Sequence, residues 1–112
     1  MAFTQDELDY LAGQRIGRLA TQAPDGSLQV NPVGFSYNAE LGTIDIGGFS
    51  MSKSRKYRNV AANGRAAFVV DDIVSVDPWK VRNVEIRGTG AVEGELIRIT
   101  PVRVLSFGLD AG

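Results

Sequence analysis

Leucines spaced three residues apart begin the apolar face of a helix over residues 5–12. Thr4 and Glu7 have the spacing of a capping box, in which the threonine oxygen accepts from the Glu7 amide and the glutamate accepts from the Thr4 amide. Phe3 and Leu8 occupy the two positions of a hydrophobic staple. The chain therefore opens with a short, well-capped helix.

From residue 15 the apolar positions alternate, which is typical of strands. The runs 15–22 and 28–37 flank a Pro-Asp-Gly turn and predict a hairpin. Pro32 has no N–H for a ladder, so the second strand is an edge, bulges, or faces something other than a strand there. Four more strands are expected at residues 43–48, 65–73, 82–93 and 96–107, with residues 74–81 as a connection.

A second helix is predicted between two of these strands, in the stretch "GGFSMSKSRKYRNVAANG". Ser52 or Ser54 would cap it, and it would run to about Asn63 before Gly64 ends it. Its buried face is expected at three positions with helical spacing, Tyr57, Val60 and Ala61.

Six strands joined mainly by hairpins, with only two short helices, predict a mainly β protein with an antiparallel barrel. A doubly wound α/β sheet would need a helix between most strands, and the chain has too few. At 112 residues the expectation is one domain over residues 1–112.

The second helix gathers four of the 12 basic residues within six positions: Lys53, Arg55, Lys56 and Arg58. They form either a solvated face or an anion pocket. Basic residues at a helix N-terminus oppose the macrodipole, each at a cost of roughly 0.3–1 kcal/mol, unless an anion neutralises them. Gly47 and Gly48, just before the helix, let a ligand approach the backbone closely. These features together favour the anion pocket.

The amino-acid composition limits the kinds of catalysis and binding that the protein can perform. The chain has no cysteine and no histidine, which excludes thiol and imidazole nucleophiles and the usual zinc, haem and iron–sulfur ligand sets. The net charge of -1 gives no basic field for nucleic acid. Asp71, Asp72 and Asp77 lack a regular ligand spacing, so no metal site is predicted. Without a signal pattern or a long apolar run, we expect a cytoplasmic protein with no membrane span.

The lone tryptophan, Trp79, lies beside Lys80 and Arg82. Such a tryptophan is either part of the core or lies against a planar ligand held across a subunit boundary. The pattern alone leaves both interpretations open.

Four motifs resemble the pyridoxamine-5′-phosphate-oxidase-like split-barrel proteins: "GRLATQAPDGSLQVNPVGFSYN", "GTIDIGG", "KSRKYRNVAANGRAAFVVDD" and "DPWKVRNVEIRG". The chain is most similar to the actinobacterial branch that uses the deazaflavin coenzyme F420. The resemblance implies a homodimer of six-stranded split barrels, with cofactor sites between the subunits. The chain ends "VLSFGLDAG", without the Arg and His segment by which pyridoxamine phosphate oxidases grip their substrate.

By the same resemblance, Lys53, Ser54, Arg55 and Lys56 would hold the cofactor phosphate and the start of a glutamate tail. Backbone groups of Asn31, Pro32 and Val33 would line the ring, and Gly47 and Gly48 would pass under the ribityl chain. Trp79 and Lys80 would reach in from the partner subunit.

The function implied is an oxidoreductase in which reduced F420 transfers a hydride to a conjugated small-molecule acceptor. The proton would come from water or from a side chain such as Tyr37 or Tyr57, and no catalytic residue is assigned. Two alternatives stay open: an FMN-binding reductase or oxidase on the same fold, and a non-catalytic module that binds a flavin or tetrapyrrole.

Overall fold

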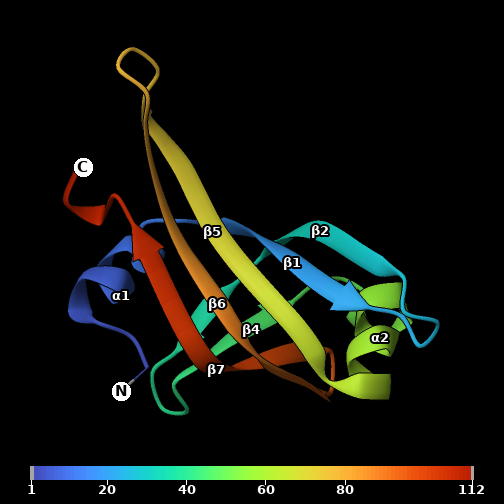
Figure 1. Ribbon diagram of the computed structural model, residues 1–112. Helices are drawn as coiled ribbons and strands as arrows, with labels where there is room; N and C mark the ends of the chain where they lie inside the picture. Colours follow the sequence, from blue (N-terminus) through green and yellow to red (C-terminus); the bar gives the residue numbers. More distant parts are fainter. Residues whose placement is uncertain (1, 112) are drawn as a thin grey trace.

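The computed structural model describes residues 2–111. Its elements, in chain order, are α1 (Gln5–Ala12), β1 (Ile16–Gln22), β2 (Leu28–Gly34), β3 (Ser36–Asn38), β4 (Thr43–Gly47), the 3-10 turn η1 (Met51–Lys53), α2 (Arg55–Asn63), β5 (Arg65–Ser75), β6 (Lys80–Glu93), β7 (Leu96–Phe107) and the 3-10 turn η2 (Leu109–Ala111). The mainly β class with two short α-helices is confirmed, as Figure 1 shows.

The strands form one antiparallel sheet in the order β2-β1-β5-β6-β7-β4-β3. Its two edge strands, β2 and β3, are separated in sequence by Phe35 alone. The sheet must therefore curl until its edges approach each other, which makes it a half-barrel. The prediction of six strands was wrong by one, because the expected strand 28–37 divides at Phe35 and its second part pairs at the opposite edge.

The inside of the curl is filled by alternate residues of the strands, as a pleated sheet requires. The fully buried side chains come from β1, β4, β5, β6 and β7: Leu19, Ile44, Ile46, Phe68, Val70, Val84, Ile86, Ile97 and Ile99. Pro32 lies on β2, an edge strand of the sheet, which is the first of the three alternatives that its missing N–H left open.

Helix α1 has the predicted capping box. The Glu7 amide donates to Thr4 Oγ1 at 3.2 Å, and the Thr4 amide donates to Glu7 Oε1 at 2.8 Å. Tyr10 then ties the helix to the sheet, since its hydroxyl donates to Asp72 Oδ1 at 2.9 Å. No helix within residues 2–111 has the length and apolarity needed to cross a bilayer.

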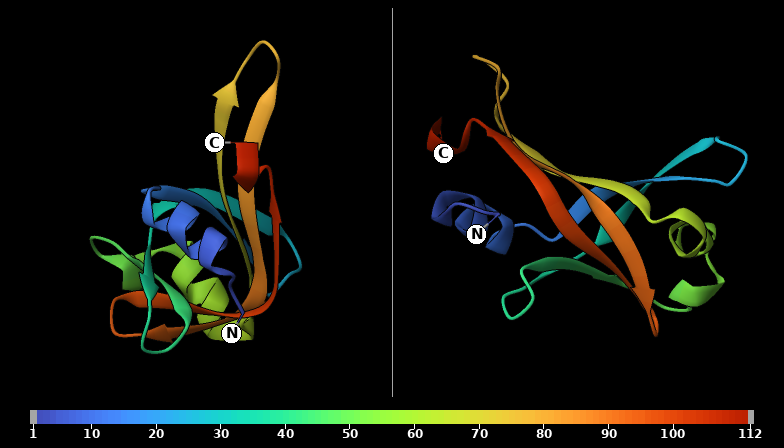
Figure 2. Two further views of the ribbon diagram at one scale, coloured as in Figure 1. Left: turned by 90° about the vertical axis from the view of Figure 1, so that its left-hand side faces the viewer. Right: turned by 60° about the horizontal axis from the view of Figure 1, so that its bottom comes forward.

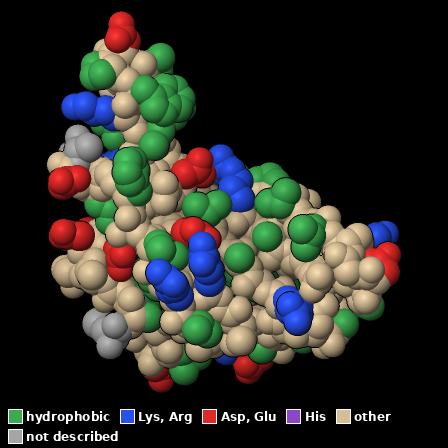
Figure 3. All heavy atoms as spheres, in the orientation of Figure 1, with side chains coloured by type: hydrophobic (Ala, Val, Ile, Leu, Met, Phe, Trp, Pro, Cys, Tyr) green, Lys and Arg blue, Asp and Glu red, His purple; other side chains and the backbone are tan. Residues whose placement is uncertain are grey.

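The β5–β6 hairpin extends well beyond the rest of the sheet as a two-stranded arm, seen at the top of Figure 1 and in both views of Figure 2. The connection expected over residues 74–81 was too long: β5 continues to Ser75, β6 begins at Lys80, and only residues 76–79 form the turn. The exposed apolar side chains of the arm include Ile73, Val76 and Trp79, and Figure 3 shows hydrophobic surface along it.

Helix α2 lies where the curled sheet is open, next to the β1–β2 hairpin. Gly64 ends it in the left-handed conformation (φ 68°), as predicted. Gly90 of β6 lets the helix pack closely, because a Cβ there would lie 2.8 Å from Val60 Cγ1. The expected buried face was partly wrong: Val60 is buried and Tyr57 half-buried, but Ala61 is exposed and Asn59 takes the inward position.

Candidate functional site

The start of α2 carries the predicted cationic cluster on a well-formed cap. Ser54 is the N-cap, and its Oγ accepts from the Tyr57 amide at 3.3 Å while donating to the Met51 carbonyl at 2.7 Å. The Arg58 amide donates to the Ser54 carbonyl at 3.2 Å. Within the described residues, the amides of Arg55 and Lys56 have no protein acceptor. Two N–H groups are therefore available at the positive end of the helix dipole.

The side chains of Lys53, Arg55 and Lys56 have no carboxylate within 4 Å among residues 2–111. Arg58 is partly engaged, because it donates to the Lys53 carbonyl at 3.2 Å. The cluster thus keeps the repulsion that its sequence predicted, since no carboxylate of the described residues pairs directly with these three side chains. Hydrogen bonds within its own turn lower the pKa of Asp25, and the charge of Arg55 adds to this effect at longer range.

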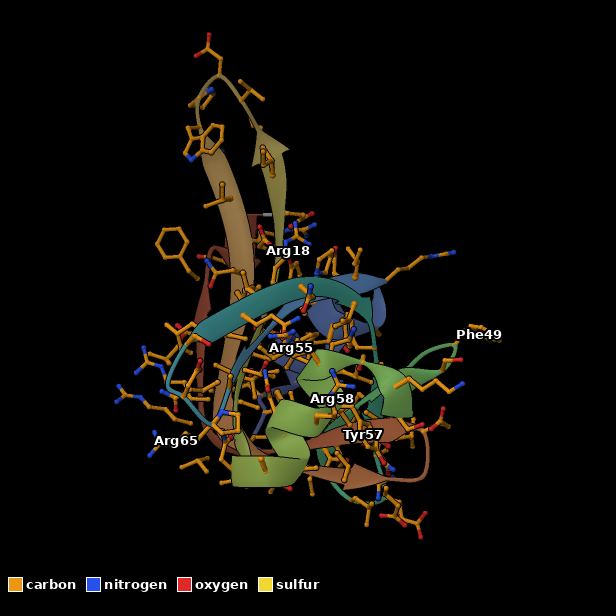
Figure 4. All side chains as sticks on the ribbon, turned by 90° about the vertical axis from the view of Figure 1, so that its right-hand side faces the viewer. Arg18, Phe49, Arg55, Tyr57, Arg58 and Arg65 are labelled. Atoms are coloured by element: carbon orange, nitrogen blue, oxygen red, sulfur yellow. The ribbon has the colours of Figure 1, made fainter. Side chains whose placement is uncertain are left out.

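A hollow of about 460 Å³ separates α2 from the β1–β2 turn. Its lining residues are Ala23, Pro24, Asp25, Arg55, Arg58 and Asn59. In Figure 4, Arg55 and Arg58 lie between the helix and the hairpin. The one carboxylate here, Asp25, accepts from Ser27 Oγ at 2.7 Å and from the Ser27 amide at 3.0 Å, and these bonds lower its pKa. Asp25 is thus occupied by its own turn, and the arginines face the hollow without an ion-pair partner.

Gly47 and Gly48 lead from β4 towards the cluster. Both are exposed, and the Met51 amide donates to the Gly48 carbonyl at 3.3 Å, which folds the loop back towards α2. A Cβ on Gly47 would lie 3.1 Å from Leu96 Cδ2, so the position is tight for any larger residue. The next residue, Phe49, is fully exposed and projects from the body in Figure 4. Sequence reasoning did not single it out.

The three β2 residues predicted to line the ring divide between the two faces of the sheet. Asn31 and Val33 point to the inside of the curl, half-buried and buried, while Pro32 is exposed on the outside. The Val33 side chain belongs to the core, so only its backbone is available to a ligand.

Two further polar residues, which sequence reasoning missed, connect β2 to α2. Asn59 Nδ2 donates to Thr21 Oγ1 at 3.1 Å and to Gln29 Oε1 at 3.3 Å, and Gln29 Nε2 donates to Asn31 Oδ1 at 2.8 Å. A sequence signal for Asn59 exists: it is adjacent to Val60, so it lies at the edge of the apolar face of the helix, where a buried polar side chain needs a polar partner on the sheet. These hydrogen bonds link Asn31 on β2 to the helix that carries the cations.

Trp79 and Lys80 are not part of this cluster in the single chain. Both are exposed on the arm, which Figure 1 shows at the end of the molecule away from α2. Any contribution from them has to come from a second copy.

The two tyrosines considered as proton donors have different surroundings. The Tyr57 hydroxyl donates to the Gly94 carbonyl at 2.7 Å, which fastens α2 to the β6–β7 turn. The Tyr37 ring packs edge-on against Phe3, with ring centroids 5.5 Å apart, next to α1. Neither hydroxyl lines the hollow between α2 and the β1–β2 turn.

The acidic residues of the sequence are mostly partnered. Asp72 accepts from Arg82 Nε at 3.0 Å, and Asp71 lies 3.6 Å from Arg18. Within the described residues no group of three His, Cys, Asp or Glu side chains is arranged to hold a metal ion.

A family model described as pyridoxamine 5′-phosphate oxidase matches residues 3–101. The chain is 44% identical over 122 residues to a 5a,11a-dehydrotetracycline/5a,11a-dehydrooxytetracycline reductase of Streptomyces rimosus, in a match that covers 98% of this chain and 86% of that protein. The chain therefore belongs to the pyridoxamine-5′-phosphate-oxidase-like split-barrel family, and the Streptomyces relative fits its actinobacterial branch.

Solved structures share the fold. A conserved hypothetical protein of Mycobacterium tuberculosis superimposes with a TM-score of 0.78 at 20% identity, covering 96% of this chain and 86% of its own. A protein described as an F420 reductase superimposes with a TM-score of 0.63 at 23% identity, covering 81% of this chain and 89% of its own.

Proposed function

We propose that this protein is an F420-dependent reductase of a conjugated organic acceptor. The main support is that three cations and two free amides at the start of α2 have no ion-pair or hydrogen-bond partner among the described residues. The 44% identity to a reductase supports the reaction class. A phosphodiester suits this donor set, because it is anionic and accepts several hydrogen bonds at once.

In this proposal Lys53, Arg55 and Lys56 bind the phosphate with the first-turn amides of α2. Ser54 acts as the cap that holds this turn in place, since its hydroxyl is used on both sides by Met51 and Tyr57. Gly47 and Gly48 offer a backbone surface without side chains to the ribityl chain.

The ring would lie against the inner face of β2, near Asn31 and the backbone of Pro32 and Val33. When bound, reduced deazaflavin supplies a hydride to an electron-poor carbon of the acceptor. The protein's residues then have to anchor the phosphate, orient the ring and let a proton reach the neighbouring carbon. We assign that proton to water, because the Tyr57 hydroxyl hydrogen is engaged by Gly94.

The name of the Streptomyces relative indicates the acceptor class. That name gives its substrates as 5a,11a-dehydrotetracycline and 5a,11a-dehydrooxytetracycline. We propose an acceptor of similar kind, with a carbon–carbon double bond conjugated to a carbonyl. The fully exposed Phe49 offers an apolar contact for such a molecule at the edge of the site.

A homodimer is part of the proposal. The outer face of the sheet exposes Leu28 (82%) and Val30 (65%), and Val30 lines a hollow of about 250 Å³. The arm exposes Val76 (71%) and Trp79 (65%). Apolar surface of this extent favours association, and a second copy would bring Trp79 and Lys80 towards the site. Light scattering should give twice the chain mass, and Val30→Asp should shift the protein towards monomer. A wild-type protein that is monomeric at micromolar concentration would contradict the dimer.

The function is tested by titrating the purified protein with F420 and, separately, with FMN, while following the fluorescence of each. Binding of F420 but not FMN, followed by oxidation of bound reduced F420 when an enone is added, is the expected result. Binding of FMN alone would favour the FMN-dependent alternative. Binding of F420 with no turnover against enones, quinones and tetracycline-like acceptors would favour a non-catalytic binding module.

A further inference from the structure

Asn31 is held by only one end of its side-chain amide. Its Oδ1 accepts from Gln29 Nε2 at 2.8 Å. Its Nδ2 has no acceptor within the described residues. Every buried side-chain nitrogen and oxygen of residues 2–111 has a hydrogen-bond partner, so this unpartnered Nδ2 must be accessible to solvent. Asn31 therefore lies on the inner face of β2 with an N–H donor that points to solvent and is free for a ligand.

The direction of this amide depends on Asn59, which is 3% exposed in the middle of α2. Asn59 donates both to Thr21 Oγ1 and to Gln29 Oε1. With its oxygen turned towards Asn59, Gln29 has only its Nε2 left for Asn31. The donor at Asn59 thus fixes the orientation of the Gln29 amide, and the Gln29 amide in turn fixes the orientation of the Asn31 amide.

The register of the hairpin supports this arrangement. Thr21 and Gln29 are directly opposite each other on β1 and β2, and Asn31 is two residues further along the same face as Gln29. Next on that face comes Val33, which is buried. Asn31 therefore stands at the boundary between the apolar core and the open end of the curl.

We propose that Asn59 and Gln29 are positioning residues that fix the Asn31 amide with its N–H outward, so that it donates to a ring carbonyl of the cofactor. The inference rests on the proposed function, and it names a recognition contact that the phosphate site does not supply. The ligand chemistry is a planar heterocycle with a carbonyl oxygen at its edge.

The decisive variant is Asn59→Asp. A carboxylate cannot donate, so Gln29 should turn its Nε2 towards the new carboxylate and its Oε1 towards Asn31. Asn31 would then donate inward and present its oxygen to the ring carbonyl, which places two acceptors against each other. Asn63→Asp is the matched control, because it adds the same charge one turn later on α2, at a residue that bonds Gln22 and Arg65 instead.

The first readout is made on the ligand-free protein by NMR of the side-chain NH₂ groups. In the wild type and in Asn63→Asp, the Asn31 NH₂ should exchange rapidly with water. In Asn59→Asp it should be protected, because it now donates to Gln29. An Asn31 NH₂ that is already protected in the wild type, or that is unchanged in Asn59→Asp, would overturn the inference whatever the cofactor.

The second readout separates ring recognition from charge. The probes are F420 and the deazaflavin nucleoside that keeps the ring and ribityl chain but lacks the phosphodiester and glutamate tail. Asn59→Asp should weaken binding of the nucleoside by about tenfold, the scale of one lost hydrogen bond plus repulsion, and binding of F420 by more, because the added carboxylate also repels the phosphate. Asn63→Asp should weaken only F420, through its charge.

Loss of F420 binding alone in Asn59→Asp would show an effect of charge and contradict the ring contact. If Asn59→Asp does not fold, Gln29→Leu removes the middle of the chain of hydrogen bonds without adding charge, and it should weaken both probes about threefold while its thermal unfolding confirms the fold. Equal affinities of Gln29→Leu and wild type for both probes would overturn the inference. Should wild type bind neither probe, the proposed function and the ring contact fail together, while the NH₂ exchange still reports on the amide direction.

Discussion

The charged side chains of the β4–β7 pair and those at the start of α2 differ in how their charges are balanced. On β7, Arg98 donates to both oxygens of Asp45, at 3.0 and 3.2 Å, and its remaining nitrogen donates to Glu93 at 2.9 Å. Asp45 also accepts from Asn38 and Thr43. In the cluster at α2, Lys53, Arg55 and Lys56 have no such partner among the described residues.

The difference separates a structural role from a binding role. A charge whose hydrogen bonds are all made within the protein stabilises the fold and has nothing left for a ligand. A group of like charges without counter-charges costs stability and is suited to an anion from outside. Substitutions in the two groups should therefore change different quantities, stability in the first and ligand affinity in the second.

Replacing Asp45 should have the largest effect, and it should act on stability. Asp45→Ala leaves the half-buried Arg98 without its main partner, and the free energy of unfolding should fall by about 2–4 kcal/mol. Urea denaturation measures it, with Glu40→Ala as the control, since Glu40 lies exposed in the turn before β4. A change below about 0.5 kcal/mol, the range of an ordinary surface substitution, would show that the paired charges of Asp45 and Arg98 do not stabilise the fold.

Replacing Lys56 should act on binding instead. Lys56→Ala removes one charge-assisted contact to the phosphate and should weaken F420 binding by about 1.5–3 kcal/mol. The fold should be unaffected or slightly stabilised, because one repulsive charge is gone. Fluorescence titration and thermal unfolding of the same sample measure both. Arg103→Ala is the control, because Arg103 is an exposed cation on β7. Equal effects of the two variants on F420 affinity would show that the cluster is only a solvated helix face.

Stability should decrease at acid pH because of the paired carboxylates. Hydrogen bonds from Arg82 hold the pKa of Asp72 below its ordinary value; burial would raise that of Asp45, but bonds from Arg98, Asn38 and Thr43 lower it. Groups with a lowered folded pKa stabilise the protein above their unfolded pKa, about 3.9, and lose this contribution as the pH falls through the folded value.

Thermal unfolding between pH 7 and pH 3 should therefore show a melting temperature that falls below about pH 4. Asp72→Asn should lower the melting temperature at pH 7 and make the acid decrease shallower. A wild-type melting temperature that is constant down to pH 3 would show that these pairs contribute nothing to stability.

The smallest effect is expected at Tyr57. Tyr57→Phe removes the hydrogen bond to Gly94 and should reduce the free energy of unfolding by about 0.5–1.5 kcal/mol. Because we assign the proton to water, the turnover number should change less than twofold. Chemical denaturation and steady-state assays measure the two quantities. A turnover reduced tenfold or more with F420 affinity unchanged would make Tyr57 the proton donor after all.

Local features of the fold could be predicted from the sequence. The capping box of α1, the Pro-Asp-Gly hairpin and the Ser54 and Gly64 limits of α2 each depend on residues a few positions apart. β3 and the length of the β5–β6 arm depend on which strands pair, and those partners lie far apart in the chain. The division at Phe35 could not be seen, because β2 and β3 form one continuous alternating run in the sequence.

The same limit applies to the site. The crowding of Lys53, Arg55 and Lys56 was visible in the sequence, but their lack of partners was not. Arg98 and Asp45 are 53 residues apart, and nothing in the local sequence of Arg98 distinguishes this paired cation from the unpaired ones. The inward turn of Asn59 was missed because a polar residue in a helix is ordinarily placed outside, and only the facing Thr21 and Gln29 make its burial favourable.

If the unpaired cations at the start of α2 bind the phosphate of a deazaflavin, affinity should depend on that phosphate and on salt. The measurement compares the wild-type affinities for F420 and for the deazaflavin nucleoside without the phosphodiester and tail, at low and at high salt. We expect F420 to bind at least about 30-fold more tightly at low salt, with the difference shrinking as salt rises. Equal affinities for the two molecules at low salt would show that these cations do not bind the phosphate.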